Sequence, residues 1–480
     1  MADTPCRVRR VVVRGNRRTH DSVIRQELSA LRDARTLGEI GDVCVGASGV
    51  IRGLGVFDSA EMVCDAAPGQ SADGLPLADV VVTVAEKKKG LLSAQTGVHT
   101  QSGEGSMDAN VTVRNLLGRA ERIDFKSEMG QQKSTAFVLS ASKPRWLGTD
   151  TELTAKLAKE SVSHLKHSSF IEKLRSVSVS VVTGQREAVQ HELTAELALR
   201  DVGKLPLRTA SWAMLQQRGM SAKASVRHAA TLDRLDDSLV PTSGYALKLS
   251  NEVAGLLGVG DARFSKHALS AAAHVPLLPN GLLSLGLSLS AGLLMPTGPG
   301  GSYHAAGVPP QSPSCVCDRF FAGGACGAQP FRGFRTNGVG PREPRHTASG
   351  AGGSAAGGGG SARDALGGEA LGVATVSLSA PLPGAKPRAH GVRAQVFSSF
   401  GGLHAIRDLR GDGGGGGGGA TVADVAGGLF RGARASVGAG LVMPTGLGRL
   451  ELSISHVLKR QPQDAVQRSG WQIGISGTIV

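Results

Sequence analysis

An arginine held between aromatic residues and a glycine is the feature of this 480-residue chain with the clearest chemical potential. It stands in Phe331-Arg332-Gly333-Phe334, shortly after Asp318-Arg319 and Gly323-Gly324. A guanidinium presents a fixed fork of donors, which suits a buried ion pair better than an ammonium does. Because this segment lies between apolar strands, we expect a loop that folds back into a lumen, where Arg332 finds its partners.

The remaining residues that could do chemistry do not form an active site. The histidines are scattered, and none stands at the spacing of a catalytic triad or a metal site. Glycine pairs such as Gly401-Gly402 lack the strand-to-helix context that a phosphate-binding loop needs. The sequence therefore predicts a protein that is not an enzyme and that has no cofactor and no metal.

The cysteines show no pairing pattern. Three of them cluster and leave a metal site open, but the four-ligand spacing of structural zinc is missing. Unpaired thiols are the favoured interpretation. The six are Cys6, Cys44, Cys64, Cys315, Cys317 and Cys326.

The composition is unusual for an enzyme core. The chain has 68 glycines, 4% aromatic residues and a formal net charge of +14. The basic residues could line a polar lumen or meet anionic lipid headgroups, and both interpretations stay open. Nucleic acid is not an expected partner, because there is no basic helix and no basic stripe interleaved with aromatic residues.

No segment resembles a secretory signal or a membrane helix. The N-terminus lacks an apolar core, so we expect delivery from a cytosol without a cleaved N-terminal signal. Residues 277–295 carry no charge, but Leu283, Leu285, Leu287 and Leu289 alternate with serine and glycine. That period of two predicts a strand with one apolar face.

The elements that must position the arginine loop fall into two regions. Residues 7–88 predict a small α+β domain of order β-α-α-β-β, which begins with a β-branched run at 7–14 and a turn at Gly15-Asn16. From residue 90 to 480, segments of about ten residues alternate apolar and polar, as in a transmembrane β-barrel.

We expect about sixteen antiparallel strands in this second region. The pattern yields seventeen candidates, but the number must be even if both barrel ends lie on one side, so one candidate in 160–217 is suspect. The candidates are 90–100, 107–115, 121–130, 133–142, 150–160, 173–183, 189–200, 208–216, 221–231, 243–253, 262–275, 281–293, 369–380, 389–400, 431–443, 448–458 and 469–480.

Two long loops interrupt the strand series. Residues 294–368 are expected to form the lumenal loop that carries Phe331–Phe334, and their last part is rich in glycine, alanine and serine. Residues 404–428 contain an unbroken glycine run and are expected to be a flexible insertion.

Several motifs in this order resemble the outer-membrane assembly superfamily that includes bacterial BamA. The N-terminal region resembles a POTRA domain, and a single such domain without a signal resembles the central barrel subunit family of the mitochondrial sorting and assembly machinery. The resemblance covers nearly the whole chain. It is carried by Gly55-Val56-Phe57-Asp58, Arg208-Thr209-Ala210-Ser211-Trp212, Gly244-Tyr245-Ala246-Leu247-Lys248, Asp318-Arg319-Phe320-Phe321-Ala322-Gly323-Gly324 and Gly438-Ala439-Gly440-Leu441-Val442.

The resemblance implies that Arg332 lies inside the barrel, with Gly333 allowing a close backbone approach and Phe331 and Phe334 packing the loop. The chain departs from the family pattern at Phe331, where valine or isoleucine is usual. Ser377 and Ser399 stand where bacterial relatives carry an acid. Glu451 is a possible counter-charge for Arg332, and a merely solvated lumenal glutamate is the equal alternative.

The first and last strands carry residues that could loosen a seam between them. Ser93, Gln95 and Gly97 lie in the first strand, and Gly474 and Gly477 in the last. Glycine weakens strand pairing, which favours a lateral gate, but glycines that fit barrel curvature explain the pattern equally well. Gln472, Gly474 and Ile479 also resemble a mitochondrial barrel targeting signal, although Gly477 occupies an expected apolar position.

The resemblance implies insertion of β-barrel precursors into the mitochondrial outer membrane at this lateral gate. The implied partners are β-barrel precursor proteins, metaxin-like subunits and outer-membrane lipids, with the POTRA domain in the intermembrane space. One alternative is a polypeptide-translocating barrel of a chloroplast or bacterial outer envelope. A passive porin-like channel is a weaker alternative, because it predicts neither the N-terminal domain nor the arginine loop.

Overall fold

The computed structural model describes most of the chain. The described residues are 4–71, 74–87, 91–101, 104–131, 134–146, 150–185, 187–203, 209–278, 281–297, 314–325, 329–346, 363–406, 427–428, 432–446 and 448–476.

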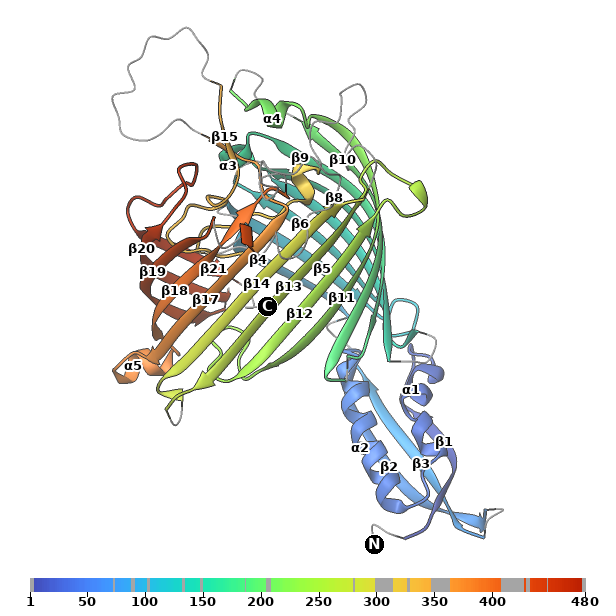
Figure 1. Ribbon diagram of the computed structural model, residues 1–480. Helices are drawn as coiled ribbons and strands as arrows, with labels where there is room; N and C mark the ends of the chain where they lie inside the picture. The colour runs from blue at the N-terminus through green and yellow to red at the C-terminus, as the bar shows by residue number, and fades with distance from the viewer. Residues whose placement is uncertain are drawn as a thin grey trace. The chain divides into compact units, whose positions relative to one another are not determined.

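The N-terminal region folds as a three-stranded sheet with two helices, as predicted. Its elements are β1 (Arg7–Arg14), α1 (Asp21–Glu27), a 3-10 turn η1 (Ser29–Arg32), α2 (Leu37–Gly53), β2 (Phe57–Gln70) and β3 (Pro76–Glu86). The sheet order is β1-β3-β2, with β1 parallel and β2 antiparallel to β3 (Figure 1).

Local sequence explains these elements. Thr36 caps α2, because its hydroxyl accepts a hydrogen bond from the Glu39 amide at 3.2 Å. Apolar side chains of the helices, such as Ile24 and Ile51, are buried together with Val80 and Val82 of the central strand. Gly15 has a φ of +92°, and a Cβ there would lie 2.0 Å from the Val84 oxygen, so the turn after β1 requires glycine.

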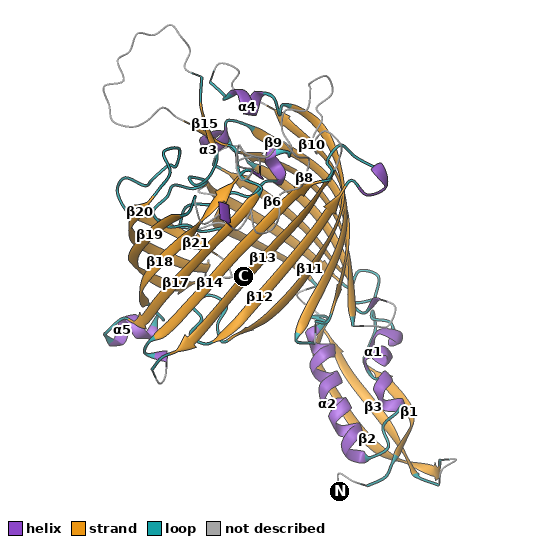
Figure 2. Cartoon of the chain, in the orientation of Figure 1, coloured by secondary structure: helices purple, strands orange, loops and turns teal. Residues whose placement is uncertain are grey.

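The second region is one antiparallel sheet of sixteen strands that curls into a barrel (Figures 1 and 2). Neighbouring strands follow chain order throughout. They are β4 (Leu92–Gln101), β5 (Glu104–Arg114), β6 (Arg122–Gly130), β7 (Thr135–Lys143), β8 (Thr151–Ser163), β9 (Ile171–Thr183), β10 (Val189–Gly203), β11 (Gly219–Leu235), β12 (Gly244–Ala254), β13 (Phe264–Pro276), β14 (Ser284–Pro296), β17 (Ala370–Pro381), β18 (Arg393–His404), β19 (Arg434–Thr445), β20 (Gly448–Lys459) and β21 (Trp471–Ser476).

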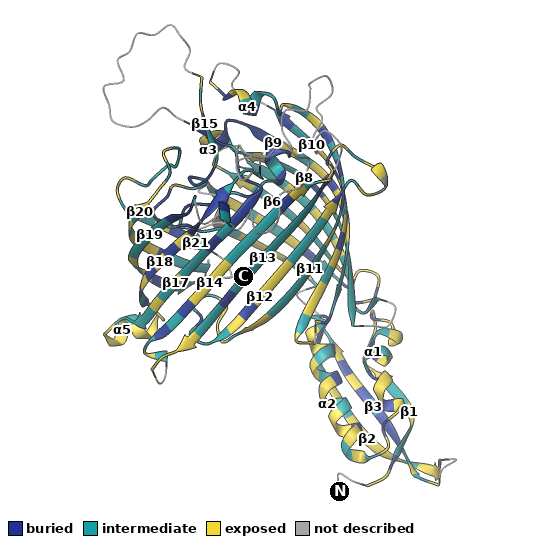
Figure 3. Cartoon of the chain, in the orientation of Figure 1, coloured by how far each residue is buried: buried dark blue, intermediate teal, exposed yellow. Residues whose placement is uncertain are grey.

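The alternation that predicted these strands sorts their side chains between the two faces of the sheet, and Figure 3 colours each residue by how far it is buried. In β10, Leu193, Leu197 and Leu199 are exposed, whereas Ala198 and Arg200 are buried. Outward leucines and inward polar residues are the pattern of a barrel in lipid. Among the described residues, no helix is long and apolar enough to cross a bilayer.

One of the seventeen predicted strands is wrong, and it lies in the suspect region. In 208–216, Trp212–Leu215 form a short helix, α4. The segment does not alternate between two faces, because the adjacent Ala210 and Ser211 are both buried. Ala210 and Met214 belong to a cluster with Phe170 and Val202. The other sixteen candidates each overlap a strand of the sheet, which confirms the expected fold.

The two ends of the barrel differ in their longest connections. At one end the strands join through short connections such as β11–β12, and the longest is β17–β18 (382–392), which contains helix α5 (Ala385–Ala389). At the other end lie α3 (Leu165–Ser168), α4 and the long segment between β14 and β17. This segment contains a 3-10 turn, η5 (Val316–Asp318), and a small hairpin of β15 (Arg342–Pro344) and β16 (Arg363–Ala365).

The chain divides into two compact units. The first comprises 1–95, 109–126 and 138–156, and the second comprises the rest. Inside the first unit, the Glu27 carboxylate pairs with Arg145 at 2.6 Å, and the Asn115 amide donates to the Thr19 hydroxyl at 2.9 Å.

Candidate functional site

The predicted arginine loop forms a compact turn in the segment between β14 and β17. The Phe331 amide donates to the Gly324 carbonyl at 3.0 Å, and the Gly324 amide donates to the Phe334 carbonyl at 3.2 Å. Gly333 has a φ of +92°, and a Cβ there would lie 2.9 Å from a methyl carbon of Val457 on β20. Glycine is therefore needed for both the turn and its approach to the barrel wall.

Arg332 reaches Glu451 on β20 through both ends of its fork. Its Nη2 donates to Oε2 at 2.8 Å, and its Nε donates to Oε1. The side chains are 11% and 4% exposed, so the pair is largely shielded from water. The guanidinium also lies over the Phe397 ring of β18, 4.7 Å from its centroid.

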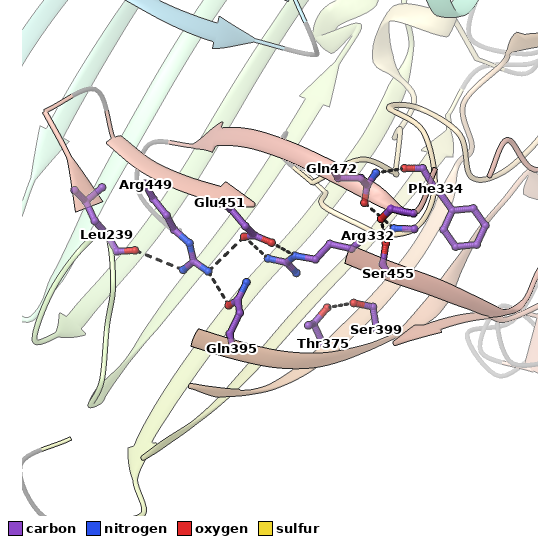
Figure 4. Close-up of polar contacts among 12 residues, drawn as sticks. Leu239, Arg332, Phe334, Thr375, Gln395, Ser399, Arg449, Glu451, Ser455 and Gln472 are labelled. Atoms are coloured by element: carbon purple, nitrogen blue, oxygen red, sulfur yellow. Dashed lines mark hydrogen bonds and ion pairs between the residues drawn. The ribbon is translucent and has the colours of Figure 1, made fainter. Parts of the chain in front are cut away.

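Glu451 has a second basic neighbour. Nη2 of Arg449 lies 3.5 Å from Glu451 Oε2 and donates to Gln395 Oε1 at 3.3 Å. Figure 4 shows Arg332 and Arg449 approaching Glu451 from two sides. Arg332 and Arg449 thus share the Glu451 carboxylate on β20. From the sequence alone, a merely solvated lumenal glutamate was an equal alternative at this position.

The two serines at the positions where an acid is expected in bacterial relatives have local partners. Ser399 and Thr375 hydroxyls lie 2.9 Å apart, and Ser377 donates to the Gly286 carbonyl at 3.4 Å. Neither serine can supply a negative charge to the arginine.

The phenylalanines of the tetrapeptide are buried. Phe331 and Phe334 meet edge to face with ring centroids 5.0 Å apart. They belong to a cluster with Phe320, Leu371 and Leu403, which joins the loop to β17 and β18. Burial of such rings and their edge-to-face contact both favour a fixed loop.

Gln472 on β21 contacts the backbone of this tetrapeptide. Its Oε1 accepts from the Gly333 amide at 2.8 Å, and its Nε2 donates to the Phe334 carbonyl at 2.7 Å. Sequence suggested Gln472 only as part of a targeting signal. Its inward position follows from strand alternation, because its neighbours Trp471 and Ile473 are exposed. Its partner in the loop could not be inferred from the sequence around it.

Asp318 and Arg319 anchor the start of the described loop segment. Asp318 accepts two 2.8 Å hydrogen bonds from Nη1 of Arg200 on β10, and its carbonyl accepts from Lys266 of β13 at 2.7 Å. Arg319 donates to the Ser314 hydroxyl at 2.7 Å and to the Leu366 carbonyl at 3.0 Å. Its Nε lies 3.8 Å from buried Glu369.

The predicted glycine pair Gly323-Gly324 has positive φ angles of +126° and +93°. A Cβ on Gly323 would lie 2.4 Å from the Arg335 carbonyl oxygen. The pair therefore permits the reversal that brings the tetrapeptide back toward Gly324.

Two further buried ion pairs join strands and loops of the second region, and they were not predicted from the sequence. Arg434 of β19 binds Asp464 at 3.0 and 3.1 Å, with both side chains almost fully buried. Asp364 of β16 accepts from Arg345 at 2.7 Å and from the Ser211 amide at 2.9 Å. A charged residue at an inward strand position, such as Arg434, was the available signal for such a pair. Its partner Asp464 lies in the connection between β20 and β21, so the pairing could not be inferred locally.

A half-buried histidine, His167, lies in α3, in the connection between β8 and β9. Burial, assisted by nearby Lys166, Arg342 and Arg345, lowers the pKa of His167 to about 4. The imidazole is therefore neutral near pH 7, which suits its packed surroundings.

The predicted gate residues lie on the two terminal strands of the sheet. Ser93, Gln95 and Gly97 are on β4, and Gly474 is a buried residue of β21. A Cβ on Gly97 would lie 2.7 Å from the Asp108 carboxylate of β5. Gly477 and Ile479 lie outside the described residues, as do most of the predicted 404–428 insertion and Cys326.

The described residues contain no group of histidine, cysteine and acidic side chains that could hold a metal ion. Within the same part of the chain, Cys6, Cys44, Cys64, Cys315 and Cys317 are free thiols.

A family model for the Omp85 superfamily domain matches residues 115–479. The sorting and assembly machinery component 50 homolog A of Xenopus laevis is 31% identical over 453 residues, covering 93% of this chain and 85% of the relative. The Homo sapiens homolog is 30% identical over 368 residues, covering 76% and 69%.

Among solved structures, BamA from Haemophilus ducreyi lacking POTRA domains 1–3 superposes with a TM-score of 0.73 at 18% identity. The match covers 98% of this chain and 84% of the other. It shows a shared fold, in agreement with the sixteen-stranded sheet and N-terminal α+β domain. The chain is therefore an outer-membrane β-barrel protein of the Omp85 superfamily and belongs to the family of sorting and assembly machinery component 50 homologues.

Proposed function

We propose that the protein inserts and assembles β-barrel precursors into the mitochondrial outer membrane. The observation that carries the proposal is its 31% identity, over 93% of its length, to a relative named as a component of the sorting and assembly machinery. Its expected partners are β-barrel precursors, metaxin-like subunits of an assembly complex and outer-membrane lipids. The N-terminal POTRA domain then faces the intermembrane space, and no catalytic step is required.

The physical task is to keep backbone amides paired while a strand enters hydrocarbon. An unpaired backbone group in lipid costs several kcal/mol, so a precursor strand needs a partner edge throughout insertion. Strand addition to an existing sheet supplies such an edge. The candidates for this partner edge are the terminal strands β4 and β21. They stand at the two ends of the sheet order, and among the described residues no pairing joins them.

The loop contacts support a role in shaping one side of this seam. Gln472 connects β21 to the backbone of Gly333 and Phe334, and Arg332 is paired with Glu451 on the neighbouring strand. In the proposed mechanism these contacts hold β21 in place while the edge of β4 that is not paired with β5 adds a precursor strand. The glycines of the two strands weaken pairing between β4 and β21 and so keep this edge available.

The loop contacts count against the translocation alternative. Whole-polypeptide passage through the lumen would require displacement of the segment held by Arg200–Asp318 and Arg332–Glu451, whose side chains are at most 11% exposed. Breaking a buried pair is expensive, because it leaves an uncompensated charge.

Site-specific crosslinking to an arrested precursor tests the proposal. Single cysteines replace Gln95 on β4, Ile473 on β21, the outward-facing Leu193 on β10 and the lumen-lining Ser288 on β14, in a chain whose native cysteines are serine. We expect a precursor with one cysteine in its last strand to be captured at Gln95→Cys and Ile473→Cys. Capture only at Ser288→Cys would contradict lateral insertion, and equal capture at Leu193→Cys would show unspecific contact.

A further inference from the structure

A basic pocket lies inside the lumen toward the end where the strands join by short turns. Its volume is about 420 Å³. Val240 and Pro241 of the β11–β12 turn, Arg393 at the start of β18 and Arg449 near the start of β20 line it. The rest of its wall comes mainly from inward residues of β13, β14 and β17. This volume falls within the range of small-molecule sites.

The pocket has an excess of positive charge. Lys248, Arg332, Arg393 and Arg449 line it, and Glu451 is the sole carboxylate among its described lining residues. Glu451 is already shared by Arg332 and Arg449 (Figure 4). Adding an anion would therefore offset charge that the protein itself leaves uncompensated.

Arg393 is held in place without a carboxylate. Its Nη2 donates to the carbonyls of Gly281 at 2.9 Å and Ser379 at 3.1 Å, and its Nε donates to the Ser379 hydroxyl at 3.3 Å. Its other terminal nitrogen, Nη1, donates to no group in the described part of the chain. The side chain is thus oriented by neutral acceptors and keeps one donor for a ligand.

Two other lining features suit an anion. The ammonium of Lys248 on β12 is exposed and has no ion-pair partner within the described residues. Small hydroxyl side chains supply neutral donors along the adjoining wall, including Ser288 and Ser290 of β14 and Thr375 of β17. The carboxylate of Asp236 in the β11–β12 turn acts on Arg393 electrostatically, but it forms no ion pair with Arg393 in the described part of the chain and accepts instead from the Thr242 hydroxyl at 2.6 Å and the Ser243 amide at 3.1 Å.

We propose that this pocket is a binding site for a small oxyanion, with Arg393 as its principal contact and with Lys248, which lines the same pocket from β12, adding longer-range attraction. Carboxylates and phosphates share the required chemistry, because both accept charge-assisted hydrogen bonds from guanidinium and ammonium groups. Arg393 has no part in the proposed strand insertion, and occupancy of the site does not depend on a precursor.

Calorimetric titration of the full-length protein in detergent, with sodium pyrophosphate in one arm and citrate in the other, tests this site. We expect saturable binding at low ionic strength that weakens as salt is added. Arg393→Gln should weaken binding about tenfold, since it removes one charge-assisted contact. Lys248→Gln should weaken it about twofold, since it removes only a more distant positive charge. Binding of only one probe would assign the site to phosphates or to carboxylates.

Arg388→Gln is the matched control, because Arg388 is an exposed residue of α5 outside the pocket lining. It makes the same change of charge and should leave both titrations unaltered. Retained heat-modifiable gel migration shows that each barrel is folded. If Arg393→Gln fails this check, the exposed Lys248→Gln decides the question. No binding of either probe, or equal weakening by Arg388→Gln, would overturn the proposal.

Discussion

Glu451 is the residue whose removal should disturb the lumen most, because two guanidiniums share it. Glu451→Gln leaves Arg332 and Arg449 without their common negative partner at a position where its side chain is 4% exposed. Loss of one partner of a buried ion pair costs about 3 kcal/mol. We expect a lower urea midpoint in detergent and faster proteolysis of the 329–346 segment.

Glu187→Gln provides the comparison for this prediction. Glu187 is an exposed acid between β9 and β10, so the same substitution removes one charge without breaking a buried pair. Its urea midpoint should match the wild type. A Glu451→Gln protein as stable and as resistant to protease as Glu187→Gln would rule out a bracing role for the pair.

At the scale of elements, β21 depends on the arginine loop as well as on its neighbour β20. Gln472→Leu would leave the Gly333 amide and the Phe334 carbonyl without their side-chain partner, at a cost of about 1–3 kcal/mol. We expect faster amide hydrogen exchange over 471–476. Ile473→Leu, which alters an outward side chain of the same strand, should leave exchange unchanged. Equal exchange in both variants would show that the loop does not hold β21.

At the scale of the whole molecule, the fold and the family membership lead to one cellular expectation. Depletion of the protein should leave newly imported outer-membrane β-barrels unassembled, because their strands lack a partner edge in the bilayer. Helix-anchored outer-membrane proteins satisfy their backbone internally and should still insert. Native gels of both classes after depletion provide the measurement. Normal barrel assembly would eliminate the insertase proposal.

The sequence determined the elements because their signals are local. Alternation of leucine with serine in 283–290 predicts a two-faced strand, and the structure has β14 there. The same reasoning found the N-terminal α+β domain and the segment of Arg332. It failed at 208–216, where Ala210 and Met214 pack into a cluster with Phe170 and Val202 and a helix forms instead.

Only the tertiary structure decided which distant side chains meet. Arg332 and Glu451 are 119 residues apart, and Gln472 lies 139 residues from Gly333, so no local pattern connects them. Their meeting depends on the pairing register of the intervening strands and on the path of the loop into the lumen. The sequence identified the arginine, while strand register and loop packing selected its carboxylate and assembled the basic pocket around it.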